Sequence, residues 1–176
     1  MKKIVLTYGF IGGGLLVAMM LLTLPFHDRI GFDRGIYVGY TTMVLAFMMV
    51  YFGVVSYRDN VAGGTITFGR AFKVGLLISL ITMACYVAAW QVIYPVFMSD
   101  YLDKYTVHML EQAKLAGATA EQLAAQEKEM REFGELYQSS PLIQVAFTLL
   151  EPLPVAVVFT LVTAGITSRK RQAVRA

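Results

Sequence analysis

Charged residues are scarce in this chain. They make up 15% of its 176 residues, whereas 57% are hydrophobic, and the mean hydropathy is +0.59. A soluble domain usually carries about 25% charged and about 45–50% apolar residues. This composition excludes an ordinary soluble domain and indicates a protein that presents apolar surface to lipid.

Cysteine and histidine are nearly absent, which limits the available chemistry. The single cysteine, Cys85, has no partner for an internal disulfide, and we interpret it as a small apolar packing residue. The two histidines, His27 and His108, are far apart, and no spacing matches a metal site or a Ser/His/Asp or Cys/His catalytic set. The sequence therefore predicts no metal, no cofactor and no enzyme activity.

Apolar residues gather into four runs, at about residues 4–24, 35–57, 72–94 and 141–166. Each is close to the roughly 20 residues that a helix needs to cross a hydrocarbon core of about 30 Å. The first run is longer than a signal-peptide core of about 7–15 residues and lacks a small-residue cleavage site, so we expect it to be retained. We predict an all-α membrane protein with four transmembrane helices, a single domain over residues 1–176.

The basic residues are distributed unevenly among the connections. They are in excess at the N-terminus, in the second connection and at the C-terminus, whereas the third connection has four basic and eight acidic residues. Four spans place the three basic segments on one side, and basic segments are usually cytoplasmic. We therefore predict that both termini are cytoplasmic. Because topology explains the basic residues and the long connection is acidic, we expect no nucleic-acid binding.

The long third connection, at about residues 98–140, has the pattern of two helices. Apolar residues recur every three or four positions in each half, which indicates one apolar face per helix. Gly117 can end the first helix, and Thr119 followed by Gln122 is a capping-box pattern that opens the second. Glu127 and Arg131 are spaced for an i,i+4 pair. We predict an extramembrane helical hairpin, or two helical extensions of spans three and four.

Three stretches taken together carry a family resemblance. "GGTITFGRAFKVGLLISLI", "GATAEQL" and "FTLLEPLPVAVVFTLVTAGITSRK" resemble the uncharacterised bacterial membrane proteins grouped as domain-of-unknown-function family 4199. The matching motif positions are Phe68, Gly69, Ala71, Phe72, Lys73, Val74 and Gly75 in the first stretch, and Glu151, Pro154 and Val155 in the third. Arg70 and Ala156 depart from the residues common in the family. The resemblance, from about Lys3 to Arg169, implies a bacterial inner (cytoplasmic) membrane location and adds no activity.

Glu151 is the main candidate for function. It lies about ten residues into the fourth run, and so roughly 15 Å deep at 1.5 Å per residue, next to Pro152 and Pro154. A charge at a helix centre costs roughly 2.5–3.5 kcal/mol, so we expect the carboxyl to be protonated or hydrogen-bonded. The candidate donors are the hydroxyls of Tyr40, Thr41, Thr42, Ser79, Thr82 and Tyr86. Glu151 is either a structural group at a proline kink or a proton or cation relay.

Two further groups of residues have structural interpretations. Gly9 and Gly13, and Gly35 and Gly39, form small-xxx-small patterns that favour close helix packing. We expect such packing within the chain more than between copies of it. The stretch from Asn60 to Lys73 reads as a loop followed by an amphipathic lead-in at the cytoplasmic interface. Its anchoring residues would be Arg58, Phe68, Arg70, Phe72 and Lys73, binding anionic lipid.

Two functions remain open at this point. The first is a non-enzymatic scaffold or accessory protein that binds a protein partner through the hairpin at residues 98–140. The alternative is a small transporter or ion-coupling protein, working as a homo-oligomer in the lipid bilayer, that uses Glu151. A Glu151→Gln substitution would distinguish the two, because only the relay needs the ionisable group.

Overall fold

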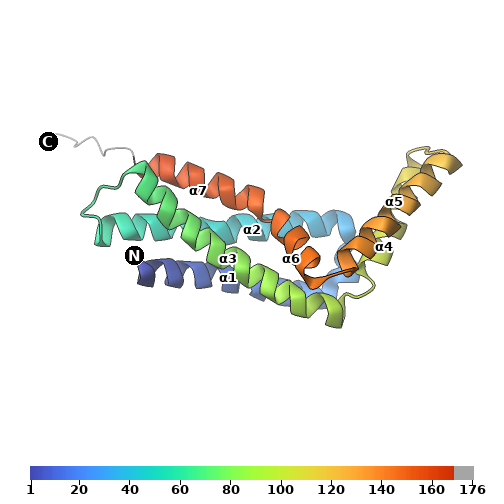
Figure 1. The fold of residues 1–176 in the computed structure, drawn as a ribbon, viewed down its shortest axis with the longest axis horizontal. Helices are drawn as coiled ribbons and strands as arrows, with labels where there is room; N and C mark the ends of the chain where they lie inside the picture. Colours follow the sequence, from blue (N-terminus) through green and yellow to red (C-terminus); the bar gives the residue numbers. More distant parts are fainter. Residues whose placement is uncertain (169–176) are drawn as a thin grey trace.

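The computed structural model describes residues 1–168, and these fold into helices without a strand among them (Figure 1). The elements are α1 (Lys2–Thr23), the short 3₁₀ helix η1 (Leu24–Phe26), α2 (His27–Asn60), α3 (Phe68–Phe97), α4 (Tyr101–Leu115), α5 (Ala120–Gln138), α6 (Pro141–Leu150) and α7 (Leu153–Thr167). Helices α1, α2, α3 and α7 run side by side, and α4 and α5 form a hairpin that projects from one end (Figure 1).

The long helices have the length and composition of membrane spans. Residues Lys2–Phe26, Arg29–Asn60 and Phe68–Phe97 are each long and apolar enough to cross a bilayer. Helices α6 and α7 meet at a bend of 45° and make a fourth span if they are counted together. The all-α membrane fold is therefore confirmed, with three or four spans by length and composition.

The bundle is held by an apolar centre and by a few polar bonds between helices. Phe47 and Val50 of α2 and Ile78 of α3 are completely buried. Ser79 Oγ and Thr160 Oγ1 lie 3.0 Å apart, and Thr82 Oγ1 donates to the Gly9 carbonyl at 3.2 Å. Because lipid gives no hydrophobic drive between helices, close packing and such bonds hold α1 and α7 to α3.

The glycines of α1 and α2 have different surroundings. A Cβ atom at Gly9 would lie 2.7 Å from Ile81 Cβ, and one at Gly13 would lie 2.5 Å from Cys85 Cβ, so α1 packs on α3 at glycines. Cβ atoms at Gly35 and Gly39 would have nothing within 4 Å. The expected close packing at Gly35 and Gly39 is therefore wrong.

The first connection is more helical than the sequence predicts. Residues 24–34 form η1 and the first turns of α2, with a break at Gly31 (φ 71°, ψ 169°) that glycine accommodates without a Cβ clash. The third span also starts earlier than expected. Because α3 begins at Phe68, the stretch Phe68–Lys73 is part of the span and not a separate lead-in.

The hairpin follows the sequence pattern closely. Gly117 has φ 87°, which ends α4, and Thr119 and Gln122 form the reciprocal bonds of a capping box at the start of α5. The expected pair of Glu127 with Arg131 is not among the ion pairs of the described residues, and the i,i+4 pair on α5 joins Lys128 to Glu132 at 3.8 Å. Helices α4 and α5 contact each other, and their apolar residues Met109, Ala113, Leu123 and Met130 are half-buried, whereas the acidic residues of both helices are exposed.

Candidate functional site

The fourth span breaks at Glu151 and Pro152. Glu151 caps the end of α6, Pro152 precedes α7, and the two helices are bent by 45°. Pro152 and Pro154 have no N–H to donate to the carbonyls one turn back, so the helix cannot continue straight through them. Regular bonding resumes where the Ala156 N–H donates to the Pro152 carbonyl at 2.9 Å. The sequence positions the carboxyl at this break and not within a continuous helix.

Tyr86 of α3 binds the carboxyl. Its hydroxyl donates to Glu151 Oε2 at 2.5 Å, a distance typical of a charge-assisted O–H···O⁻ bond. Of the six hydroxyls that the sequence offered, the structure brings this one to Glu151. Tyr86 is 7% exposed, whereas Glu151 is an exposed residue whose other oxygen, Oε1, accepts no hydrogen bond from the described part of the chain. The carboxyl is therefore fixed on one side and open on the other.

The open side faces a cavity of about 470 Å³ between the bundle and the base of the hairpin. Residues from all elements except α7 line it, including Met20 of α1, Thr42 of α2 and Phe147 of α6. Among the side chains that the structure describes in this wall, Glu151 is the only Asp, Glu, Lys or Arg, and His27 is the other strongly polar group. Gly35 and Gly39 also line the cavity, which explains the open space beside them.

Aromatic rings form the wall on the hairpin side of the cavity. The Trp90 ring centroid lies 5.7 Å from that of Tyr94 and 6.1 Å from that of Tyr101, and Tyr94 and Tyr137 are 5.4 Å apart. In the sequence, Trp90 and Tyr94 lie near the end of the third apolar run, and Tyr101 and Tyr137 lie in the third connection. Their positions could have predicted the contact, because all four residues lie within one or two helical turns of the junctions between the spans and the hairpin.

Hydrogen bonds fix the hairpin base against the cavity. Trp90 Nε1 donates to Tyr137 Oη at 2.7 Å, and Tyr137 Oη lies 3.4 Å from Thr148 Oγ1. The Thr148 hydroxyl donates its hydrogen to the Gln144 carbonyl at 2.7 Å. In the contact between Thr148 and Tyr137, the Tyr137 hydroxyl is therefore the donor and Thr148 Oγ1 the acceptor. Helices α3, α5 and α6 are therefore joined at one point beside Glu151.

The pKa of Tyr101 shows that this part of the cavity wall is buried and lies close to the Glu151 charge. Tyr101 is the first residue of α4, outside the spans, and burial raises its pKa to about 12. The negative charge of Glu151 adds to that rise in pKa, because it disfavours a second anion nearby. Tyr101 therefore stays protonated and neutral in the physiological range.

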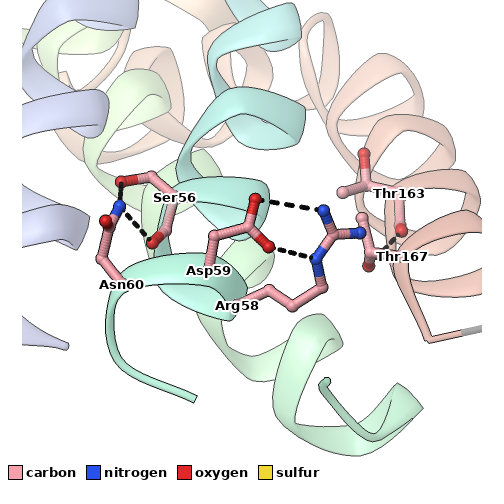
Figure 2. A network of polar contacts seen from close by, with 6 residues as sticks. All are labelled: Ser56, Arg58, Asp59, Asn60, Thr163 and Thr167. Carbon is pink, nitrogen blue, oxygen red and sulfur yellow. Dashed lines mark hydrogen bonds and ion pairs between the residues drawn. The ribbon is translucent and has the colours of Figure 1, made fainter. Parts of the chain in front are cut away.

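The expected interface residues lie at the other end of the bundle. Figure 2 shows Arg58 reaching toward the end of α7, where Thr163 and Thr167 lie, while it donates to both carboxylate oxygens of Asp59 at 2.7 and 3.2 Å. The Arg70 guanidinium lies 5.9 Å from the Tyr57 ring centroid.

The remaining interface candidates are at the start of α3. Phe68 and Phe72 stack with centroids 6.2 Å apart, and Phe68 and Lys73 are exposed. None of these five residues, Arg58, Phe68, Arg70, Phe72 and Lys73, lines the cavity. They form a separate surface at the basic end.

Among the side chains described in residues 1–168, which leave out that of Asp28, no three metal-ligating groups gather together. The two histidines belong to other contacts: His27 packs edge-on to Phe32, with ring centroids 5.7 Å apart, and His108 Nε2 lies 3.2 Å from Asp33 Oδ1. The arrangement at Glu151 can thus bind a proton, a cation or a hydrogen-bond donor through protein groups alone.

A family model described as "Protein of unknown function (DUF4199)" matches residues 7–169. No curated protein and no solved structure matches the chain. The match spans the bundle, the hairpin and the bent fourth segment, so the cavity lies within the matched region.

Proposed function

The chain belongs to the DUF4199 family of proteins of unknown function, and from its cavity we propose that it is a small transporter or ion-coupling protein. In this proposal Glu151 binds a proton or a cation at the break in the fourth span. The single observation that supports it is the position of the carboxyl, which Tyr86 fixes on one side and the cavity opens on the other.

A purely structural role for Glu151 accounts for less of the geometry. A group that only capped a kink would be expected to bond the carbonyls freed by Pro152 and Pro154 and to be enclosed. Glu151 instead bonds another helix and is exposed to the cavity. An uncompensated charge at this depth would cost roughly 2.5–3.5 kcal/mol, so a carboxyl kept there fits a functional group.

The titratable groups around Glu151 also fit this proposal. Tyr86 of α3, Tyr101 of α4, Tyr137 of α5 and His27 of α2 line the same cavity. None of them is a fixed cation, so neutralisation of the carboxylate falls to a proton or to a bound ligand. We include in the proposal that the protein is not an enzyme, because no nucleophile–base pair accompanies the carboxyl among the described lining residues.

The proposed location is the bacterial inner membrane with both termini in the cytoplasm. The N-terminus and the α2–α3 connection lie at the end of the bundle opposite the hairpin (Figure 1). That end carries Lys2, Lys3, Arg58, Arg70 and Lys73, and basic segments favour the cytoplasmic side. The basic residues Arg169, Lys170, Arg171 and Arg175 lie outside the described residues.

A scaffold or accessory role is the second candidate, and the projecting hairpin favours it (Figure 1). The outer faces of α4 and α5 carry most of the eight acidic residues of this segment and could meet a basic partner. However, the apolar stripes of the hairpin are mostly half-buried. The rest of the hairpin surface is mainly charged, with single exposed apolar residues such as Val107, Leu115 and Leu136, and the centres of protein interfaces are depleted in charged residues.

Labelling by a hydrophobic carbodiimide tests the proposal, because this reagent modifies protonated carboxyls that it reaches from lipid or from a cavity. The purified protein in lipid is treated across about pH 6 to 9, and peptide mapping locates the adduct. We expect modification of Glu151 that decreases as the pH is raised. The matched controls are Glu151→Gln, which removes the target, and Glu132→Gln, which removes an exposed hairpin carboxyl.

The two outcomes separate the candidates. Labelling at Glu151 that depends on pH supports a titrating group in contact with the cavity. Absence of labelling at every pH, in a sample whose exposed glutamates react with a water-soluble carbodiimide, would contradict the relay. A partner of the hairpin would then become the leading explanation.

A further inference from the structure

We propose that the cavity binds an organic ammonium ion with an apolar chain, its nitrogen between Glu151 and the Trp90 and Tyr101 rings. This inference rests on the proposed function, because it makes the cation of that proposal an alkylammonium. The ligand could be a free amine or the amine head group of a lipid, since both present the same chemistry.

The first argument is charge. Glu151 is the only charged Asp, Glu, Lys or Arg side chain among the described residues that line the cavity. Its Oε2 accepts the Tyr86 hydrogen, and Oε1 accepts no hydrogen bond from the described part of the chain. A fixed carboxylate with one open oxygen selects a cation, and it favours one that carries an N–H donor.

The second argument is the aromatic wall. Trp90 and Tyr101 meet at a nearly right angle of 87°, with centroids 6.1 Å apart, and Tyr94 lies 5.7 Å from Trp90. Rings set at an angle present more than one face to a neighbouring group, and aromatic faces attract alkylated ammonium ions. A bare metal cation would gain little from such a wall, because most of its ligands would have to be oxygens.

The third argument is the apolar remainder of the cavity. Beyond the rings, the wall consists mainly of aliphatic and methionine side chains such as Met19, Leu16 and Ile36. The glycines Gly35 and Gly39 widen this part, with nothing within 4 Å of a Cβ placed on them. A volume of about 470 Å³ lies in the range of small-molecule sites and accommodates an alkyl chain beside the head group.

The chain carries its own reporter for this site, because Trp90 is the only tryptophan. We would reconstitute the full chain in nanodiscs of phosphatidylglycerol, whose head group has no amine. Quenching of Trp90 emission by N-octylpyridinium then measures cation entry. Octylammonium, which does not quench, is added as a competitor, with octanol as its neutral counterpart.

We expect saturable quenching in the native chain, which octylammonium reverses and octanol does not. Glu151→Gln should weaken pyridinium binding through loss of the negative charge, and it should raise the apparent Kd of the octylammonium competitor about tenfold or more, because only that ion loses a charge-assisted N–H bond. Gly39→Leu, which fills the cavity from another helix, should also abolish saturation, whereas Glu132→Gln should bind normally. Circular dichroism establishes that each variant is folded.

The lipid composition distinguishes the two sources of the amine. If phosphatidylethanolamine in the nanodisc weakens pyridinium binding, the lipid head group occupies the site; if only added octylammonium competes, the ligand is a free amine. Either result supports the proposal. Linear, unsaturable quenching that is equal in the native chain and in folded Glu151→Gln and Gly39→Leu variants would overturn it.

The carbodiimide experiment separates this inference from the function on which it rests. Glu151 labelling that depends on pH, together with unsaturable quenching, would leave proton or small-cation coupling standing and remove only the ammonium ligand. Failure of both measurements would remove both proposals.

Discussion

A single carboxyl shows how this sequence reconciles charge with an apolar surrounding. Glu151 lies where Pro152 and Pro154 already interrupt the backbone hydrogen bonds of the helix. The carboxyl therefore occupies an existing break in the fourth span and does not create one. Tyr86 supplies one strong bond to the carboxylate, and the cavity supplies space for a second. A group with only one of its two oxygens satisfied is suited to binding something that arrives and leaves.

Glycines act at the same scale, and Gly13 allows a direct test of packing between α1 and α3. In Gly13→Ala the new Cβ would lie 2.5 Å from Cys85 Cβ and 2.6 Å from Cys85 Sγ. Because Cys85 Cβ is fixed by its backbone, the helices must move apart. We expect the free energy of unfolding to decrease by about 1–3 kcal/mol, measured by reversible unfolding in mixed micelles.

The adjacent glycine provides the control for that substitution. A Cβ at Gly14 would meet nothing within 4 Å, so Gly14→Ala should be neutral or stabilising by up to about 1 kcal/mol through helix propensity. Cys85→Ala should not rescue Gly13→Ala, because the clashing Cβ remains. Equal stability of the two glycine variants would contradict the close approach of α1 to α3.

At the scale of helices, the sequence predicts the helix ends that depend only on residues close to each other in the chain. The capping box at Thr119 and the left-handed Gly117 were recognisable because each depends on residues within one turn. The charges and the proline of residues 24–34 interrupt the apolar pattern, so the sequence predicts only a connection between the first two spans there. It is helical in the structure, and its aromatic residue Phe32 packs on Tyr101 of the hairpin at 5.5 Å between centroids, a contact invisible locally.

The hairpin is attached to the bundle by a hydrogen bond between α3 and α5, from Trp90 to Tyr137. Trp90→Phe and Tyr137→Phe each remove the 2.7 Å bond between α3 and α5. We expect each to lower the free energy of unfolding by about 0.5–1.5 kcal/mol, with a double variant that loses less than the sum, because the two share one interaction. The measurement is a double-mutant cycle followed by circular dichroism during unfolding.

A different pattern in that cycle would be informative. Tyr137→Phe also removes the contact at 3.4 Å with Thr148, so a somewhat larger loss for this variant is consistent with the structure. Strictly additive losses would show that the two side chains act independently. The hairpin would then be held by ring packing and not by this hydrogen bond.

For the whole molecule, the sequence predicts the fold class and Glu151 but not the site. The four runs and the hairpin follow from composition and periodicity, which are properties of single segments. The cavity requires Tyr86, Trp90, Tyr101 and Glu151 to meet, and these lie on α3, on α4 and at the bend of the fourth span. No local pattern fixes the angle at which the hairpin returns to the bundle, so the aromatic wall could not be predicted.

The orientation in the membrane is the last property of the whole molecule, and cysteine labelling tests it. Cys85 is first changed to alanine, because it is the only cysteine. Thr65→Cys then marks the exposed α2–α3 connection, and Lys128→Cys marks the hairpin, where the native side chain is 71% exposed. A membrane-impermeant maleimide added to spheroplasts should label the hairpin variant before lysis and the connection variant only after it.

This result is expected because the connection lies at the basic end and the hairpin has an acidic excess, and basic segments are retained in the cytoplasm. The reverse labelling would place the Glu151 cavity near the cytoplasmic face, and its ligand would then arrive from inside the cell. Partial labelling of both variants before lysis would indicate two orientations of the same chain. Under the expected orientation, the cavity at the base of the hairpin lies toward the outer face, where an amine from outside the cell would reach Glu151 first.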